Sequence, residues 1–325
     1  MKQYHVTMDP IGGYFGIELG AAGNPLHLQA QGYHSGRSAL GAMCTLLSPG
    51  HVYVPFYSCD SLRAPLDAAG IETRYYSVSA RLDAELEVSL PRDGYLLYIN
   101  YFGIKEAEIE RLRAVHGQRL IVDNTHAFFR DADPLSFNSA RKFFGVPDGA
   151  YAWAPGSLPV PERRAHAAAE HLLLRDQGEA ERERGLQAYR QAETKIEHAL
   201  LAMSTLSEQL LARIDYPAAG ARRRTNFAAL HSRLRAFNPL DPQLGDAVPY
   251  AYPWLAPERL ERSALLERGV FFPTLWPEVS QRKIDGFSLE KQLADRLWPL
   301  PVDQRYDAAD MDRVATTVLD LLGRG

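Results

Sequence analysis

The feature that most limits the possible folds is a regular alternation between about residues 35 and 155. Short apolar runs in this part of the chain are separated by amphipathic segments. Such alternation is typical of βαβ units, in which parallel strands are joined by helices that cover the sheet. It predicts strands at residues 51–55, 72–76, 94–100 and 119–123 and helices at 38–47, 61–69 and 105–115. We therefore expect an α/β fold with a mostly parallel central sheet flanked by helices.

The second half of the chain has a different composition. Residues 161–214 contain almost no glycine or proline and are expected to be helical, and the charged run at 181–184 indicates a solvated helix face. Beyond residue 216 the chain is richer in proline and aromatic residues. Its predicted elements are a helix at 226–236, a strand at 269–273 and a closing helix at 308–322. The sequence thus predicts a large domain, 1–214, that includes the helical segment, and a smaller α+β domain, 215–325.

Charge and cysteine content exclude several classes of protein. Lys and Arg total 36 against 40 Asp and Glu, and the net charge of -4 offers no attraction to a nucleic-acid backbone. Cys44 and Cys59 are too few for a disulfide scaffold and do not match zinc-ligand spacing, which favours a reducing compartment and no metal. Residues 1–5 lack the apolar segment of a signal peptide, and no apolar run approaches the length of a membrane span. We expect a cytoplasmic protein without nucleic-acid or membrane partners.

Two charged residues stand where a ligand site is expected. Asp123 ends an apolar strand, and open parallel sheets bind ligands beyond the carboxyl ends of their strands, although a turn or helix-capping aspartate is an equally ordinary explanation. Lys142 is flanked by Phe137, Phe143 and Phe144. We expect this lysine to be partly desolvated, with a lowered pKa that makes its amine a nucleophile toward an aldehyde.

Three further features near these residues have both a functional and an ordinary interpretation. Ser139 lies three residues before Lys142, a spacing also found in serine β-lactamases, but the other motifs of those enzymes are absent. The small-residue turn at residues 35–38 opens a helix, where it is either an anion site or an ordinary N-cap. His126 is either a buried structural histidine or part of the site, and no second residue at metal-ligand spacing accompanies it.

In this order, the motifs resemble those of the DegT/StrS-type (DegT/DnrJ-like) sugar aminotransferase family. The resemblance is sharpest at residues 34–40 (HSGRSAL), 54–58 (VPFYS), 101–103 (YFG), 123–126 (DNTH) and 141–149 (RKFFGVPDG), and weaker at 222–226 (RRRTN) and 300–306 (LPVDQRY). It implies a fold-type I transferase that uses pyridoxal 5'-phosphate (PLP). The resemblance covers nearly the whole chain.

The resemblance assigns roles around the cofactor. Lys142 matches the lysine that forms the internal aldimine, and Asp123 matches the acid that pairs with the pyridine nitrogen and keeps it protonated. His126 matches a residue that hydrogen-bonds near the cofactor's phenolic oxygen. Ser139 would contact the cofactor phosphate from the side of the lysine.

The resemblance also predicts how the phosphate is held and how subunits assemble. Gly36, Arg37 and Ser38 match the turn whose backbone and hydroxyl bind the phosphate. Asn226 matches an asparagine that reaches the same phosphate from a neighbouring subunit, which implies a homodimer with shared active sites.

Two departures from the family pattern concern the site. Cys59 falls where many relatives have an aromatic residue over the cofactor ring, so Tyr57 or a residue from elsewhere would have to stack there. The interval from Asp123 to Lys142 is short for the family, which suggests that loops around the substrate entrance have been lost.

The implied activity is the transfer of an amino group from glutamate or a similar donor to a keto sugar, either free or nucleotide-linked. Lys142 would also move the proton between the substrate and the cofactor as general base and acid. Two alternatives remain: a regulatory or sensor protein that binds PLP without turnover, and a PLP-dependent sugar dehydratase. In the dehydratase relatives a histidine replaces the lysine, so Lys142 argues against that branch.

Overall fold

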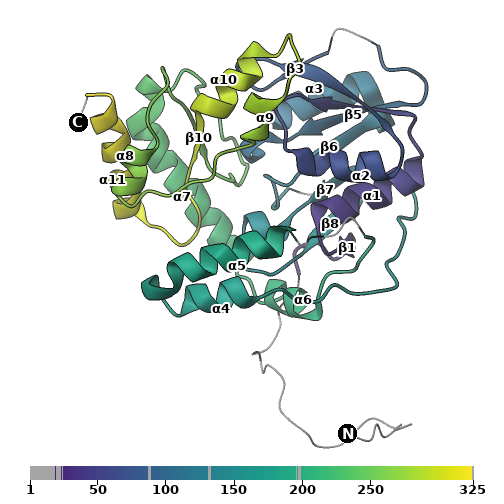
Figure 1. Ribbon diagram of the computed structural model, residues 1–325, viewed down its shortest axis with the longest axis horizontal. Coiled ribbons are helices and arrows are strands. Elements are labelled where there is room, and N and C mark those ends of the chain that lie inside the picture. Colours follow the sequence, from purple (N-terminus) through teal and green to yellow (C-terminus); the bar gives the residue numbers. More distant parts are fainter. Residues whose placement is uncertain are drawn as a thin grey trace, which may run out of the picture.

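The computed structural model describes residues 19, 23 and 25–323, apart from 87, 88, 131, 132, 195, 197 and 198. Residues 1–5, on which the expectation of no signal peptide rests, lie outside the described residues. An eight-stranded sheet in the order β1-β8-β7-β6-β5-β2-β3-β4 confirms the predicted α/β class (Figure 1). The strands are β1 (Gln31–Tyr33), β2 (His51–Pro55), β3 (Glu72–Val78), β4 (Ala84–Glu85), β5 (Gly94–Ile99), β6 (Leu120–Asn124), β7 (Ser136–Asn138) and β8 (Ala150–Trp153). The five strands from β7 to β3 are parallel, and β1, β8 and β4 pair antiparallel toward the edges.

The predicted helices between these strands are confirmed. They are α1 (Gly36–Leu47), α2 (Arg63–Ala68) and α3 (Glu106–His116). Helix α1 begins where the Ser35 hydroxyl accepts a hydrogen bond from the Ser38 backbone N–H, so Ser35 is its N-cap, and the anion site at the same turn stays a prediction. Because α1 follows β1 and packs against β7 and β8, its amino-terminal end lies near the end of β6.

The region 161–214 contains helices, as expected, but they are separated by stretches that are not helical. It contains α4 (Glu170–Asp176), α5 (Arg182–Thr194) and α6 (Thr205–Leu211). Arg164, which precedes α4, and Ala202, which lies between α5 and α6, form an isolated parallel β-bridge. The charged run behaves as expected, because Arg184 is exposed and pairs with Glu181 three residues earlier.

The elements of the carboxyl-terminal part are α7 (Tyr216–Leu234), β9 (Tyr252–Leu255), α8 (Ser263–Glu267), α9 (Glu278–Gln281), α10 (Ser288–Arg296), β10 (Leu297–Leu300) and α11 (Ala308–Leu321). Of these, α7, β9, α8, β10 and α11 surround a small core, whereas buried residues of α9 and α10 pack in the large core. Strands β9 and β10 pair antiparallel and bring the buried rings of Trp254 and Trp298 within 5.2 Å of each other. Figure 1 shows α7, α8 and α11 gathered at the end of the molecule away from β3 and β5. Among the described helices, none is long and apolar enough to cross a membrane.

Two expectations for this part need correction. The predicted strand at 269–273 is not a strand: Val270 and Phe272 are buried in the small core, but their backbone joins neither sheet. Pro273 has no N–H with which to extend a ladder. The predicted helix at 226–236 begins ten residues earlier, because the Asp215 side chain caps the first turn of α7 and Pro217 fits that turn.

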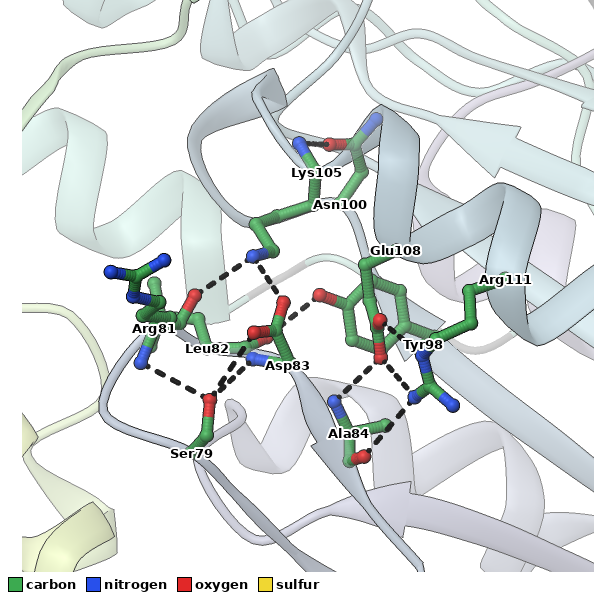
Figure 2. A network of polar contacts seen from close by, with 10 residues as sticks. All are labelled: Ser79, Arg81, Leu82, Asp83, Ala84, Tyr98, Asn100, Lys105, Glu108 and Arg111. Atoms are coloured by element: carbon green, nitrogen blue, oxygen red, sulfur yellow. Dashed lines mark hydrogen bonds and ion pairs between the residues drawn. The ribbon is translucent and has the colours of Figure 1, made fainter. Parts of the chain in front are cut away.

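A buried polar network fixes the end of β5 (Figure 2). On α3, the Glu108 carboxylate accepts hydrogen bonds from the Ala84 backbone N–H at 2.9 Å and from Arg111 at 2.6 Å. The Lys105 amine donates to the Arg81 carbonyl, and the Lys105 backbone N–H donates to the Asn100 side chain. Helix α3 thereby holds both the loop before β4 and Asn100, the residue after β5.

Replacing Glu108 by alanine is expected to lower the free energy of unfolding by about 1–3 kcal/mol, because the partly buried Ala84 N–H loses its acceptor. Glu110 lies on the same helix but is exposed, so Glu110→Ala serves as the matched control. Chemical denaturation of both variants measures the difference. Equal stability of the two variants would contradict the assigned role of the network.

A buried arginine connects α7 to the turn that carries Lys142. Arg223 is 1% exposed, and its guanidinium donates to the carbonyls of Pro249, Tyr250 and Phe143. It also lies 4.5 Å from the centroid of the Phe143 ring. Burial lowers the pKa of Arg223 to about 10. Since Phe143 directly follows Lys142, this arginine ties the lysine turn to the carboxyl-terminal core.

Candidate active site

Segments that are far apart in the sequence meet in one cavity at the carboxyl edge of the sheet. The cavity has a volume of about 140 Å³. Six predicted site residues line it: Gly36, Arg37, Asp123, His126, Ser139 and Lys142. They come from the start of α1, the end of β6 and the turn that follows β7. This is the edge at which open α/β sheets bind ligands.

Asp123 lies on β6 and is buried. Its Oδ1 accepts a hydrogen bond from the Thr125 backbone N–H at 2.8 Å. Burial raises the pKa of Asp123 to about 6. Among the described residues no cation lies within ion-pair distance of this carboxylate. Asp123 is therefore a buried acid whose charge lacks a close counter-ion within the described chain.

The strand end that carries Asp123 is held from the side. The Asn124 side chain accepts from the Asn100 amide at 3.1 Å and donates to Asp133 at 3.0 Å. Asp133 is itself paired with Arg113 and Arg130. The position of the Asp123 carboxylate thus depends on a fully bonded polar network rather than on a free loop.

His126 is fixed between two aromatic rings. Its ring stacks on Tyr250, with centroids 4.3 Å apart, and lies parallel to Trp276 at 5.8 Å. Its Nδ1 accepts from the Phe102 backbone N–H at 3.4 Å. Burial, with a smaller contribution from the charge of Lys142, holds the pKa of His126 well below its usual range. The ring is therefore neutral and carries its proton on Nε2.

Backbone strain accompanies this stack. Phe102 and Trp276 have φ values of 59° and 58°, in the left-handed region that residues with a Cβ rarely adopt. Trp276 lines the cavity and contacts the Tyr57 ring edge-to-face at 4.7 Å. Such conformations cost about 1–3 kcal/mol and are concentrated at functional sites. Here the strain turns the Trp276 ring toward the cavity.

Lys142 lies on the cavity wall and differs from expectation in two respects. Its side chain is exposed to the cavity, while Phe143 and Phe144 are buried in a separate cluster with Phe128. The expected lowering of its pKa is wrong: burial lowers it, but Tyr250, Cys59, Tyr189 and Glu193 together outweigh burial, and the pKa is raised. Its amine forms no hydrogen bond or ion pair with any described residue.

Three predicted residues do not reach the cavity. The Ser38 hydroxyl donates to the Ala199 carbonyl at 3.0 Å and accepts from the Leu201 N–H, so it is used within the chain. Tyr57 is fully buried and does not line the cavity. The Asn226 amide donates to the carbonyls of Val302, Asp303 and Tyr306. Asn226 is fully buried in its own chain, a position that gives no support to its predicted reach to a neighbouring subunit, which stays a prediction.

The structure adds residues that the sequence did not identify. Tyr189 and Glu193 from the end of α5 line the cavity, as do Arg141 and Trp276. Glu193 pairs with Arg141 and lies 4.0 Å from Arg37. Helix α5 is highly charged and has few apolar residues, so its sequence looks like that of a solvated surface helix. No local pattern indicates that Tyr189 and Glu193 line a cavity. Arg141 belongs to the family motif at 141–149, and that motif could have identified it.

The cavity is small because the chain itself closes it. Ligand sites are usually about 300–1,000 Å³. Here the Arg37 guanidinium donates to the Ile196 carbonyl at 3.3 Å, and Ile196 lines the cavity. A second cavity of about 710 Å³ lies between α4, α5 and the carboxyl-terminal part, and Tyr189 lines both. No group of three or more His, Cys, Asp and Glu suited to a metal ion occurs among the residues described.

Comparisons with known proteins support the fold. No family model matches the chain, and no curated protein matches it. PseC of Helicobacter pylori, an aminotransferase involved in pseudoaminic acid biosynthesis, matches with a TM-score of 0.66 and 14% identity over 91% of this chain and 87% of that chain. Spr1654 of Streptococcus pneumoniae, a candidate sugar aminotransferase solved in its PLP form, matches with 0.66 and 13% over 91% and 88%.

A third structure carries the family name. A DegT DnrJ EryC1 StrS aminotransferase from Brucella abortus has a TM-score of 0.62 and 12% identity over 90% of this chain and 85% of that chain. At these identities the agreement concerns the fold. It extends over both the large sheet and the small carboxyl-terminal sheet, as the motifs predicted. The chain therefore has the fold-type I architecture of the DegT/DnrJ/EryC1/StrS-type sugar aminotransferases.

Proposed function

We propose that the protein is a PLP-dependent aminotransferase that transfers an amino group from glutamate, or a similar donor, to a keto sugar, nucleotide-linked sugars included. The observation that carries the proposal is the meeting of Lys142, Asp123 and His126 in one cavity. These residues come from separate segments and supply an amine, a buried carboxylate and a neutral imidazole N–H. A ligand shared by the three groups accounts for this combination.

The unsatisfied groups of the cavity fit PLP. Asp123 lacks a cation within the described chain, and a protonated ring nitrogen is the complementary donor. Lys142 has an amine without a described hydrogen-bond partner, and an aldehyde is the group with which an amine condenses. Arg37, Arg141 and Lys142 outnumber Asp123 and Glu193 in the lining, which favours an anionic ligand such as a phosphate ester.

Each residue then has a defined task. Asp123 would hold a proton on the cofactor's ring nitrogen, and His126 would donate its Nε2 proton to a ring oxygen. Gly36, at the amino-terminal end of α1, and Ser139 would hold the phosphate. Lys142 would attach the cofactor and then accept and return the substrate proton. When bound, PLP supplies an electron-accepting ring that stabilises negative charge on the substrate carbon.

The predicted homodimer remains part of the proposal with less support. Its structural argument was the reach of Asn226 to a neighbouring phosphate, and that side chain is committed within its own subunit. The homodimer now rests on the family resemblance alone.

Cys59 lines the cavity at the position where relatives have an aromatic residue, and its thiol lies 2.7 Å from the Ser61 hydroxyl.

A PLP-binding sensor without turnover is the second candidate, and the small volume of the cavity favours it. A side chain that occupies the substrate's place would suit a protein that binds PLP without converting a substrate. Glu193, which pairs with Arg141 and lies 4.0 Å from Arg37, is in such a position.

The test combines covalent labelling with a half-reaction. We expect borohydride reduction of the PLP-loaded protein, followed by peptide mapping, to label Lys142, because it is the lysine on the cavity wall. Incubation of the unreduced protein with glutamate is expected to release 2-oxoglutarate. Label on Lys195, which lies outside the described residues, or on any other lysine would refute the assignment. Label on Lys142 without release of 2-oxoglutarate would favour the sensor.

A further inference from the structure

The guanidinium of Arg141, the residue before Lys142, has one edge without a hydrogen-bond partner among the described residues. Its Nη1 nitrogen pairs with Glu193, whereas Nε and Nη2 are buried and have no hydrogen-bond partner in the part of the chain that the structure describes. These two N–H groups lie side by side and point the same way. They match the two oxygens of one carboxylate, which is the bidentate geometry that arginine favours.

The surroundings of this edge favour an anion. Arg37, Arg141 and Lys142 line the same cavity, and Glu193 is the acid shared by the two arginines. Asp123, the other acid of the lining, is bound to the Thr125 backbone N–H at the end of β6. The positive groups around Arg141 are therefore only partly neutralised.

One face of α5 now covers Arg141. Tyr189 and Glu193 are four residues apart on this helix, so they share a face. The Arg141 guanidinium carbon lies 5.4 Å from the centroid of the Tyr189 ring. Glu193 remains 34% exposed, so its carboxylate has water as an alternative to Arg141. Behind Tyr189 lies the cavity of about 710 Å³, which leaves α5 space in which to shift.

We infer that Arg141 is the carboxylate-binding residue of this site and that Glu193 is its internal substitute, displaced when a ligand carboxylate binds. The side-on edge of Arg141 then receives both oxygens of the ligand beside the Lys142 amine. The ligand class is a small amino acid or dicarboxylate. Its identification with the amino donor rests on the proposed function, whereas the carboxylate site itself does not.

The experiment titrates the full-length protein with glutarate, a dicarboxylate that has no amino group to transfer, by calorimetry. We expect Arg141→Met to weaken glutarate binding at least about tenfold, because a bidentate charged pair is lost. Arg141→Lys keeps the positive charge but lacks the two parallel N–H groups of the guanidinium, and it is expected to weaken glutarate binding about threefold or more. Glu193→Gln removes the competing carboxylate and is expected to tighten it. Arg184→Met, an exposed arginine of α5, is the control and leaves affinity unchanged.

A double variant tests the link between the two residues. In Arg141→Met/Glu193→Gln, the gain from the glutamine is expected to disappear, since there is no longer an arginine edge to release. Glutarate affinity that is equal in all variants would overturn the inference. So would inorganic phosphate that binds more tightly than glutarate and depends on Arg141, because the edge would then be a phosphate site. Melting curves verify that each variant is folded. If Arg141→Met does not fold, Arg141→Lys and Glu193→Gln decide the outcome.

Cofactor loading separates this inference from the proposed function. Borohydride labelling of Lys142 in the same protein reports on PLP, and glutarate titration reports on Arg141. Labelling without Arg141-dependent glutarate binding refutes the carboxylate site alone. Arg141-dependent glutarate binding without labelling refutes the aminotransferase and leaves the carboxylate site standing.

Discussion

Replacing Lys142 by arginine is expected to reduce amino transfer by at least about a thousandfold while the protein stays folded. Arginine retains the positive charge of the cavity wall, but its guanidinium does not lose a proton in proteins and cannot attach to an aldehyde. The variant therefore loses both the covalent hold on the cofactor and the group that moves the substrate proton. The measurement is release of 2-oxoglutarate from glutamate.

The controls for Lys142→Arg separate chemistry from folding. Lys283 is exposed and does not line the cavity, so Lys283→Arg is expected to retain full activity. Noncovalent PLP binding by Lys142→Arg, measured by equilibrium dialysis, is expected to survive, because Asp123, His126 and Gly36 remain. Activity within tenfold of the parent protein would show that another residue performs the transfer.

Replacing Asp123 by asparagine is expected to have opposite effects on activity and stability. Activity should fall by about a hundredfold or more, because an asparagine cannot stabilise a protonated ring nitrogen by its charge. Asp67→Asn, an exposed aspartate on α2, is the matched control for the same change. Activity near that of the control would refute the role of Asp123.

The stability of cofactor-free protein should rise in Asp123→Asn. Burial raises the pKa of Asp123 from 3.8 to about 6, so the folded chain holds this proton to higher pH than the unfolded chain does. Stability is therefore lost as the pH rises from about 4 to 6, by up to about 3 kcal/mol, and stays lost above it. The variant avoids this loss, so its advantage should be present at pH 7 and disappear below about pH 4. Denaturation of both proteins at pH 3.5 and 7 measures it.

The large sheet was predictable because its evidence is local. Each central strand is a short apolar run bounded by turn residues, and α1 has a capping serine before its first turn. The segment at 269–273 has the same apolar composition and buries Val270 and Phe272, yet it pairs with no described strand. Apolar composition indicates that a segment is buried, but it does not indicate whether another strand lies close enough to pair with it.

The candidate site was predictable where motifs carry it and not where packing does. Asp123, His126 and Lys142 follow from strand ends and a family motif, and they do meet in one cavity. Trp276 comes from a distant loop and reaches the cavity through an unusual backbone conformation, which no local pattern announces. The pKa of Lys142 could not be judged from its neighbours in sequence, because the groups that raise it come from three other segments.

The arginine at the centre of α7 has a mechanical consequence. Arg223 joins the backbone of three separate residues, one of them adjacent to Lys142, in a place closed to water. Rotation of the carboxyl-terminal part against the lysine turn would break the bond from Arg223 to Phe143 and the bond that Gln304 donates to the same carbonyl, so we expect that part and the turn to move together. We therefore expect substrates to gain access from the opposite side, through motion of the α4–α5 hairpin, from which Tyr189 and Glu193 line the cavity.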